Sequence, residues 1–333
     1  MWYGKKLKRI KIMIWFKKKY QTGILGKNPI DQRDYLLSSV QPVGVVLPEE
    51  FDLRSQQSPV QNQDGLGICY SFGVAGIGEY WNTKEYHQSI NLSERFIVYF
   101  TKKLSGLWGI QADFLRNALK AFCDNGAPLE QDYPFSTDWE DYKKEPPAEI
   151  IKKAEEFKGK TYWSVGTDLE SIRQAVFQNQ CPVFIGMPWY NNYNKPELDG
   201  RLPLPSGNKS GHAISGGYWT KDKIWFKNSW GNWGLNGYFY IPFADFSKYS
   251  IWDASIMLDL PKPIIMNEGW VASEYVRTQK YLIGQEVYPY TNLNLRDAPA
   301  GNKLLTLQKG QKLVIISEPI KSGNYNWVKV EVK

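Results

Sequence analysis

The apolar residues of this chain change their spacing once, and that change limits the folds the chain can adopt. In the first half of residues 51–260 they recur at helical spacing, and in the second half they form the short runs typical of strands. Helices followed by strands predict an α+β fold of two lobes, with a ligand cleft between them. The expected helices are 69–80, 92–98, 112–122, 149–158 and 168–179, and the expected strands are 182–186, 213–219, 223–227 and 237–241.

Prolines and turn residues divide the rest of the chain. We expect a main domain over residues 48–261, because Pro261-Lys262-Pro263 ends the regular pattern there. Residues 262–284 show little periodicity and are predicted to be a linker. Short β-rich stretches about ten residues apart then predict a small all-β barrel over residues 285–333. Residues 1–47 are expected to be a basic tail and an extended lead-in.

The net charge of +7 belongs to one end of the chain. Residues 1–20 carry eight Lys and Arg and no acid, whereas the remainder carries 33 basic and 34 acidic residues. This nearly neutral body gives no support for a specific nucleic-acid partner. The tail is expected either to contact an anionic surface or to be a solvated arm.

The tail resembles a secretory signal without matching one. Its apolar core, residues 12–16, is shorter than the ~7–15 residues of such signals, and three lysines follow at once. No apolar run approaches the ~20 residues that a membrane helix needs. The sequence therefore leaves the compartment of the protein open.

The three cysteines indicate one candidate nucleophile. They form neither a CxxC pair nor a zinc spacing, so no metal and no other cofactor is expected. Cys69 follows Gly65-Leu66-Gly67, where a loop enters the first helix, and a helix N-terminus lowers the pKa of a thiol. Cys123 lies late in a helix and Cys181 precedes a proline. Cys69 is therefore the cysteine placed for activation.

A thiol nucleophile needs a base and a group that orients the base. His87 lies in a polar stretch and is expected at the surface, whereas His212 begins an apolar strand. On position alone, His212 also fits a structural histidine. Strand pairing through a turn at Lys221-Asp222 would bring Asn228 close to His212. Gln63, six residues before the cysteine, and the cysteine's own amide are candidate donors to an oxyanion.

Several segments resemble the motifs of papain-like cysteine proteases, in the order of that family. The 143 residues between Cys69 and His212 also fall within the family's ~130–150. The resemblance implies a two-lobed papain-like fold and a peptidase that acts through Cys69, His212 and Asn228, with Gln63 lining the oxyanion hole. The segments that carry it are 51–54, 59–72, 92–94, 125–127, 133–135, 211–213, 228–231 and 234–239.

The same resemblance implies how a protein or peptide substrate is bound. Gly67, Gly109 and Gly211 are expected at the substrate backbone. Trp230 is expected to shield the hydrogen bond between histidine and asparagine, and Trp233 to line the cleft wall. Both tryptophans also fit plain core packing.

Three positions depart from the family pattern. Leu66 replaces a cysteine whose disulfide partner, near Gly106, is also absent, which suits a bacterial or intracellular version. Ile68 replaces a small residue, and we expect it to crowd the cleft. Gly211 replaces an acidic or amide residue, so the pH dependence is expected to differ.

The end of the chain resembles a second family. Residues 292–299, 305–314 and 326–330 are similar to bacterial Src-homology-3-like domains, which often attach enzymes to cell walls. The resemblance implies contact with a cell wall or a protein partner through residues 285–333, although a spacer role fits equally.

Three functions remain open from the sequence. The first is a cysteine endopeptidase that cleaves proteins through a thioester. The second, motivated by the tail, the barrel and Ile68, is a binding or structural component on a papain-like scaffold. The third, which rests on the barrel alone, is a hydrolase of cell-wall peptides.

Overall fold

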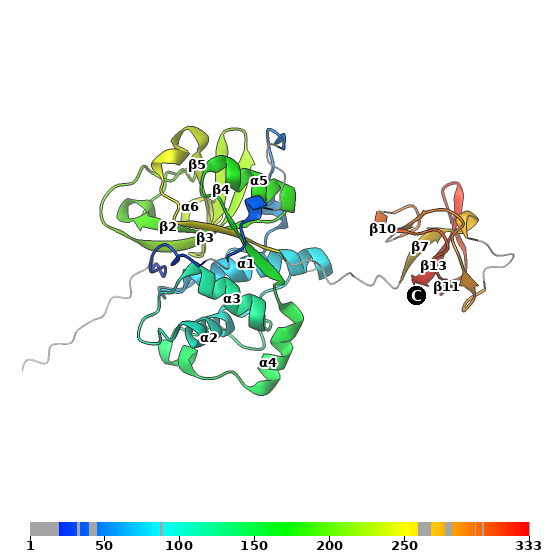
Figure 1. Cartoon of the computed structure of the whole chain (residues 1–333), viewed down its shortest axis with the longest axis horizontal. Helices are drawn as coiled ribbons and strands as arrows, with labels where there is room; N and C mark the ends of the chain where they lie inside the picture. Colours follow the sequence, from blue (N-terminus) through cyan, green and yellow to red (C-terminus); the bar gives the residue numbers. More distant parts are fainter. Residues whose placement is uncertain are drawn as a thin grey trace, which may run out of the picture. The chain divides into compact units, whose positions relative to one another are not determined.

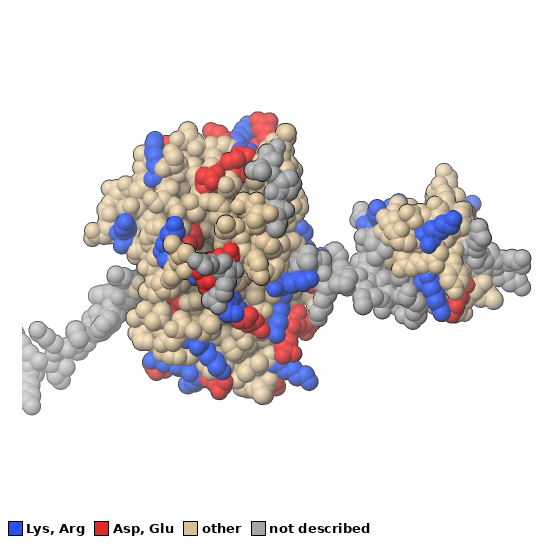
Figure 2. Space-filling model, in the orientation of Figure 1, with Lys and Arg blue, Asp and Glu red and all other residues tan. Residues whose placement is uncertain are grey.

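The computed structural model describes residues 20–31, 34–39, 45–86, 89–258, 268–276, 282–296, 298–301 and 303–332. They belong to two compact units, residues 1–259 and 260–333. Residues 1–19 of the basic tail, and His87, lie outside the described residues. On the visible face of the first unit, basic and acidic side chains are interspersed (Figure 2). No helix in the described ranges is long and apolar enough to cross a membrane.

The first unit begins with a helical lobe in which α1 lies between the other helices and the strands (Figure 1). Ser93 caps α2 by accepting a hydrogen bond from the Phe96 amide (3.2 Å). The helices expected from the sequence are confirmed with shifted ends, and the one expected at 149–158 continues as a 3₁₀ turn after Ala154. The elements are α1 (Cys69–Tyr86), α2 (Glu94–Ser105), α3 (Leu115–Asn125), η3 (Trp139–Lys143), α4 (Ala148–Ala154) and η4 (Glu155–Phe157).

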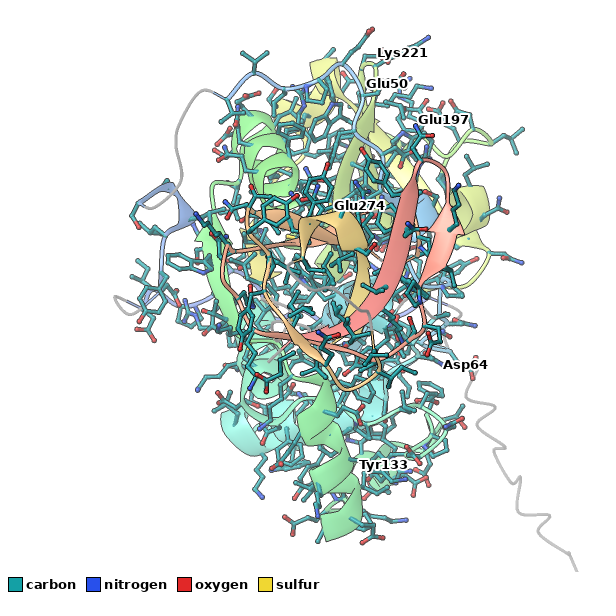
Figure 3. All side chains as sticks on the ribbon, turned by 90° about the vertical axis from the view of Figure 1, so that its right-hand side faces the viewer. Glu50, Asp64, Tyr133, Glu197, Lys221 and Glu274 are labelled. Carbon is teal, nitrogen blue, oxygen red and sulfur yellow. The ribbon has the colours of Figure 1, made fainter. Side chains whose placement is uncertain are left out.

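The second half of this unit is a sheet lobe of six antiparallel strands, in the order β1-β6-β2-β3-β4-β5. The expected turn at Lys221-Asp222 joins β3 to β4, and Lys221 lies at the opposite end of the unit from Tyr133 of the helical lobe (Figure 3). The elements are β1 (Thr161–Val165), α5 (Leu169–Asn179), β2 (Val183–Tyr190), η5 (Asn191–Asn194), β3 (Lys209–Thr220), β4 (Lys223–Lys227), α6 (Trp233–Asn236), β5 (Tyr238–Pro242), η6 (Phe243–Lys248) and β6 (Asp253–Leu258).

Two strands of this sheet were not predicted. β1 is half-buried along its whole length, so its sequence lacks the alternation that marks a strand. β6 begins 88 residues after the end of β1 and pairs with both β1 and β2. Their pairing is long-range, and local sequence patterns do not report it.

The second unit is all-β, but it begins earlier than predicted. Residues 268–276, expected within a linker over 262–284, hold a strand and a 3₁₀ turn, and β7 pairs with β13 from Glu268↔Glu331 to Ala272↔Trp327. The linker prediction is wrong there, because β7 is short and its partner lies some sixty residues away. The elements are β7 (Glu268–Ala272), η7 (Ser273–Tyr275), β8 (Glu286–Val287), β9 (Leu293–Arg296), β10 (Lys303–Leu307), β11 (Leu313–Ile315), β12 (Ile320–Ser322) and β13 (Tyr325–Val332).

A buried ion pair fixes the loop between α2 and α3. Lys102 Nζ lies 3.0 Å from Asp113 Oδ2, and both side chains are fully buried. The Lys102 ammonium also donates to the Ala112 carbonyl (2.6 Å), and the Asp113 carboxylate accepts from Ser105 and Asn117 (2.7 Å each). The pair therefore holds the Asp113 backbone in place beside the cleft.

Replacing Lys102 with methionine should lower the free energy of unfolding by about 3 kcal/mol, because it leaves the Asp113 carboxylate buried and unpaired. Urea denaturation followed by tryptophan fluorescence measures this change. The matched control is Lys103→Met, since the ion pair of Lys103 with Glu145 is exposed and should contribute less than about 1 kcal/mol. Equal losses in the two variants would contradict this account of the buried pair.

Candidate active site

Cys69 is the first residue of α1, and its side chain is fully buried. Its sulfur accepts hydrogen bonds from the amide of Ala213 on β3 (3.3 Å) and from the amide of Gly23 in the lead-in (3.2 Å). Burial raises the pKa of the Cys69 thiol to about 12, although the nearby amides act in the opposite direction. The sequence placed the thiol at a helix N-terminus, which lowers a pKa, but burial is the larger effect while the lead-in covers the sulfur.

The pairing of β3 with β4 brings His212 to Asn228. The imidazole Nε2 lies 2.8 Å from Asn228 Oδ1, and this oxygen also accepts the amide of Ser229 (2.8 Å). Because the oxygen is an acceptor in both contacts, Nε2 must carry the proton. The other ring nitrogen, Nδ1, is buried and has no hydrogen-bond partner among the described residues. It can therefore accept a proton.

The His212 ring is enclosed by tryptophans. Trp230 stacks on it with centroids 4.6 Å apart, and Trp189 contacts it edge-on at the same distance. Burial lowers the pKa of His212 to about 4, although the hydrogen bond to Asn228 acts in the opposite direction. The ring centroid of Trp233 lies 5.5 Å from that of Trp230, and the Trp233 side chain is buried. Unlike Trp230, it does not stack on the histidine, so its position agrees with core packing.

Gln63 is buried next to this group and its amide is oriented. Ser229 Oγ donates to Gln63 Oε1 (2.6 Å), which turns the amide nitrogen away from Ser229. Gln63 Nε2 donates to the carbonyl of Gln21 (3.0 Å) and to that of Leu66. The nitrogen is therefore shared between a backbone carbonyl of the lead-in and one of the loop before Cys69.

The lead-in crosses the cleft and occupies it. Residues 20–28, which we call the cleft segment, bond to the helical lobe through Asp113, whose amide donates to the Gly23 carbonyl (3.0 Å) and whose carbonyl accepts the Leu25 amide (3.1 Å). They bond to the sheet lobe through the Ile24 amide, which donates to the Gly211 carbonyl (2.9 Å). The Tyr20 ring packs on Trp230 at 4.9 Å. The segment thus pairs with both lobes and covers the thiol.

Two glycines permit this close approach. A Cβ at Gly23 would lie 2.0 Å from the carbonyl oxygen of Gly67, and a Cβ at Gly211 would lie 2.2 Å from that of Ile24. Both contacts are with backbone atoms, which cannot rotate away. The glycine that replaces the family's acidic or amide residue before His212 is therefore required by the segment that lies against it.

The sequence did not predict the location of this segment. Residues 20–28 carry no periodicity, and they contact Cys69 and Gly211 across 46 and nearly 190 residues. Gly23 and Gly26 were the only local signal, because glycines without a helix or strand pattern can mark a close backbone approach. Such a signal does not say which backbone is approached.

Three further residues were singled out from the sequence: Gly67, Gly109 and Ile68. Gly67 lies against the segment, with the Thr22 carbonyl oxygen 3.0 Å from its Cβ position, and its amide donates to Gln111 Oε1 (2.7 Å). The position of a Cβ on Gly109 has no atom within 4 Å, so its substrate contact stays a prediction. Ile68 is fully buried in the apolar cluster of the helical lobe.

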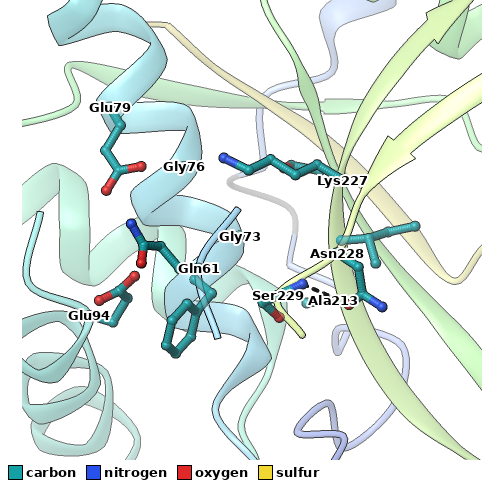
Figure 4. Close-up of a pocket in the computed structure, with 12 residues that line it drawn as sticks. Gln61, Gly73, Gly76, Glu79, Glu94, Ala213, Lys227, Asn228 and Ser229 are labelled. Carbon is teal, nitrogen blue, oxygen red and sulfur yellow. Dashed lines mark hydrogen bonds between the residues drawn. The ribbon is translucent and has the colours of Figure 1, made fainter. Parts of the chain in front are cut away.

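A buried charged cluster, which was not predicted, lies behind the site. Figure 4 shows Lys227 reaching from β4 towards α1, which carries Glu79, with Glu94 of α2 nearby. Lys227 Nζ donates to the carbonyl and the hydroxyl of Ser58 (2.8 and 2.9 Å), and Ser58 also bonds to Glu79. Because Lys227 precedes Asn228, this anchor helps to fix the end of β4. In the described part of the chain no group of three or more His, Cys, Asp and Glu side chains could hold a metal ion.

These features define a class of protein: two lobes, a thiol at the start of a helix in one lobe, and an amide-bound histidine on the sheet of the other. Residues 47–256 match the family model described as "Papain family cysteine protease". The chain belongs to the papain family of cysteine proteases, a family of thiol-dependent hydrolases.

Two known proteins are similar to this chain in sequence. Chymopapain of Carica papaya is 28% identical over 239 residues, which cover 67% of this chain and 63% of chymopapain, so the chain spans less than two thirds of that relative. Mexicain of Jacaratia mexicana is 27% identical over 205 residues, 57% of this chain and 86% of its own. Both matches are to curated relatives of the family.

The solved structures show the same fold. Xylellain, a cysteine protease from Xylella fastidiosa, has a TM-score of 0.63 at 24% identity, over 77% of this chain and all of that one. Procathepsin L 3 of the larval midgut of Tenebrio molitor has a TM-score of 0.55 at 19% identity, over 72% and 77%. The first unit therefore has the papain-like α+β fold, a helical lobe against a curled sheet.

Replacing Gly23 with valine should open the cleft, because its Cβ cannot coexist with the Gly67 carbonyl oxygen. We expect iodoacetamide to modify Cys69 at least about tenfold faster at neutral pH, measured by mass spectrometry of the Cys69 peptide. The covered thiol has a raised pKa and stays protonated until the pH nears 12. The pH at which modification becomes fast should therefore fall in the variant.

The control for this experiment is Ile30→Val, since the Ile30 side chain is almost fully exposed. It should leave the rate and the pH profile of Cys69 modification unchanged. The Cys123 peptide provides an internal reference for general unfolding. A Gly23→Val protein modified no faster than the unaltered chain would show that the segment does not protect the thiol.

Proposed function

We propose that the protein is a cysteine endopeptidase in which Cys69 is the nucleophile, His212 the base, Asn228 the group that orients the base, and Gln63 an oxyanion donor. The observation that carries the proposal is the His212–Asn228 hydrogen bond. It fixes the ring and leaves Nδ1 as an acceptor, beside the strand residue whose amide reaches the Cys69 sulfur.

The steps follow from these positions. His212 Nδ1 takes the proton of the thiol, and the sulfur attacks the carbonyl carbon of the substrate. The Cys69 amide and Gln63 Nε2 donate to the oxyanion. His212 then returns the proton to the leaving amine, which leaves a thioester between Cys69 and the acyl half. A water molecule, deprotonated by His212, hydrolyses the thioester and restores the thiol.

The cleft segment must leave before a substrate can bind. It lies over the sulfur. Burial of the Cys69 and His212 side chains opposes both charges of a thiolate–imidazolium pair, since it raises the pKa of Cys69 and lowers that of His212. The chain is thus in a resting state when residues 20–28 fill the cleft. Access of substrate depends on the exchange of this segment.

The second unit is proposed to attach the enzyme to a surface or partner, in the manner of a bacterial Src-homology-3-like domain. A hollow of about 260 Å³ supports a binding role for this unit, and Tyr275, Tyr325, Trp327 and Arg296 are among the residues that line it. Aromatic faces beside a cation and amide groups are typical of binding sites for peptides. A spacer needs no such surface.

The catalytic assignment predicts that Cys69→Ala abolishes hydrolysis of a fluorogenic casein and labelling by a thiol-trapping epoxide. Asn228→Ala should lower kcat/KM by about 100-fold or more, because the ring of His212 loses its fixed tautomer. Cys123→Ala is the matched control and should retain full activity. Unchanged hydrolysis by the Cys69→Ala protein would overturn the proposal in favour of a binding component on this scaffold.

The substrate class can be tested with the same protein. A general endopeptidase should release peptides from casein at a rate that greatly exceeds the release of amino groups from purified cell wall. The Cys69→Ala protein gives the blank for both assays. The opposite ratio would favour a hydrolase of cell-wall peptides, and a Trp327→Ala protein that no longer sediments with the wall would place attachment in the hollow of the second unit.

A further inference from the structure

The hollow of the second unit forms where β9 and β13 lie on the two sides of β7. Trp270 of β7 pairs with Arg296 on β9, and Ala272 of β7 pairs with Trp327 on β13. The side chains of Arg296 and Trp327 therefore come from opposite sides of the middle strand. Ala272 also lines the hollow, and it contributes only a methyl group there. The space between the larger side chains is thus left open by a small residue.

Three aromatic side chains that line the hollow form a continuous row. The ring centroids of Tyr275 and Tyr325 are 6.3 Å apart, and those of Tyr325 and Trp327 are 6.2 Å apart. The indole of Trp327 is held in place, because its Nε1 donates to the carbonyl of Ser322 (3.0 Å). Rigid aromatic faces offer a large apolar contact area at little cost in conformational entropy. This row is suited to an apolar side chain of a ligand.

Two asparagines supply hydrogen-bond donors to the hollow. Asn292 Oδ1 accepts the amide of Lys309 (3.0 Å), and Asn294 Oδ1 accepts the hydroxyl of Thr306 (3.4 Å). These contacts occupy the side-chain oxygens of both asparagines. The amide nitrogens have no partner among the described residues, so they are free to donate. The polar part of a ligand therefore has to present acceptors.

Arg296 brings a positive charge to the same hollow. On β9 it alternates with the buried Leu295, so its side chain points away from the core. Its Nη1 donates to the carbonyl of Gly301 (2.6 Å), and the guanidinium lies 6.0 Å from the ring centroid of Trp327. Within the described ranges Arg296 forms no ion pair. Since a guanidinium has five donor hydrogens, most of them remain open to an anion.

No acidic side chain from the described part of the chain lines the hollow. Glu274 precedes the lining residue Tyr275, but its Oε1 accepts the amide of Asn326 (3.0 Å). A cation and amide donors without a counter-charge are complementary to a carboxylate, and a guanidinium can hold both oxygens of that group at once. The chemistry of the lining thus favours a ligand that carries a carboxylate next to an apolar group.

The size of the hollow limits how the ligand enters. At about 260 Å³ it is slightly smaller than the ~300–1,000 Å³ of sites that enclose drug-sized molecules. One or two residues of a peptide fill such a space, whereas a chain that passes through needs a longer groove. A peptide end has both required groups close together, because the α-carboxylate and the last side chain share one carbon atom.

We infer that the hollow binds the free C-terminal carboxylate of a peptide whose last residue is apolar. Arg296 pairs with the carboxylate, the amides of Asn292 and Asn294 donate to neighbouring oxygens, and the aromatic row contacts the last side chain. The inference names the ligand of the attachment role proposed for the second unit and rests on that role. Hydrolysis of a peptide bond leaves such a carboxylate on the acyl half, so a cleaved substrate would itself carry the ligand.

The binding test uses the full chain with Cys69→Ala, which prevents cleavage of the probe. The probes are Gly-Ser-Gly-Ser-Ala-Leu peptides with fluorescein at the N-terminus and either a free carboxylate or an amide at the C-terminus. Fluorescence anisotropy should give at least about tenfold tighter binding for the carboxylate. Adding Arg296→Gln should remove this difference. The matched control is Lys321→Gln, an exposed cation on β12 outside the lining, which changes the net charge equally and should keep it.

A second variant tests the apolar part of the site. A peptide that ends in glycine, with a free carboxylate, should bind at least about fivefold more weakly than the one that ends in leucine. Tyr325→Ser should reduce this preference, and it is expected to fold because Tyr325 is 42% exposed. Its matched control is Tyr288→Ser, since Tyr288 is 43% exposed and lies outside the lining. A preference for leucine that survives Tyr325→Ser would contradict the role of the aromatic row.

Further arms distinguish the possible sources of the carboxylate. Equal binding of the carboxylate and amide peptides would overturn the inference. So would equally tight binding of an amidated peptide that ends in glutamate, which would assign the site to acidic side chains. Displacement of the peptide by acetate or inorganic phosphate at equal concentration would show an adventitious ion only.

The inference and the proposed function fail in different ways. A chain that hydrolyses casein and sediments with cell wall, but does not distinguish the carboxylate from the amide, would overturn this inference alone. A chain that distinguishes them through Arg296 but hydrolyses no casein would support the inference and contradict only the proposed peptidase.

Discussion

The antiparallel pairing of β3 with β4 is the constraint on which the site depends. The turn at Lys221-Asp222 and the shift of register between Gly216 and Tyr218 together place His212 next to Asn228, although sixteen residues separate them. The hydrogen bond between them then fixes the tautomer of the ring. A shift of the register by one residue would turn every side chain of one strand to the opposite face and separate the pair.

Burial of Cys69 and His212 is the second physical effect on which the cleft depends. The cleft segment lies over the thiol and tryptophans enclose the imidazole, and a low-dielectric environment disfavours the charged form of each. The contacts that hold residues 20–28 between the lobes therefore also help to keep the thiol buried and protonated. Opening the cleft would therefore change two properties together, the access of substrate to the Cys69 sulfur and the pKa of the Cys69 thiol, because the same segment covers the sulfur.

The charged side chains of the first unit differ in which part of the chain they bond to. Lys102–Asp113 and Lys227–Glu79 connect elements within the first unit and are surrounded by protein. Asp253 differs because its donor belongs to the removable segment.

The sequence alone determined the order of helices before strands, the cysteine at the start of a helix, and the turn that pairs the strands of His212 and Asn228. These features are local, because periodicity, caps and turns are encoded within some ten to twenty residues. The tertiary structure decided the rest: that residues 20–28 occupy the cleft, that β7 joins the second unit, and that Asp253 accepts the amide of Asn28. Each joins segments about fifty to more than two hundred residues apart, and no local pattern encodes which distant backbone a segment will meet. For the same reason the pKa of Cys69, which a helix terminus alone would lower, is raised in the folded chain, where burial by a distant segment is the larger effect.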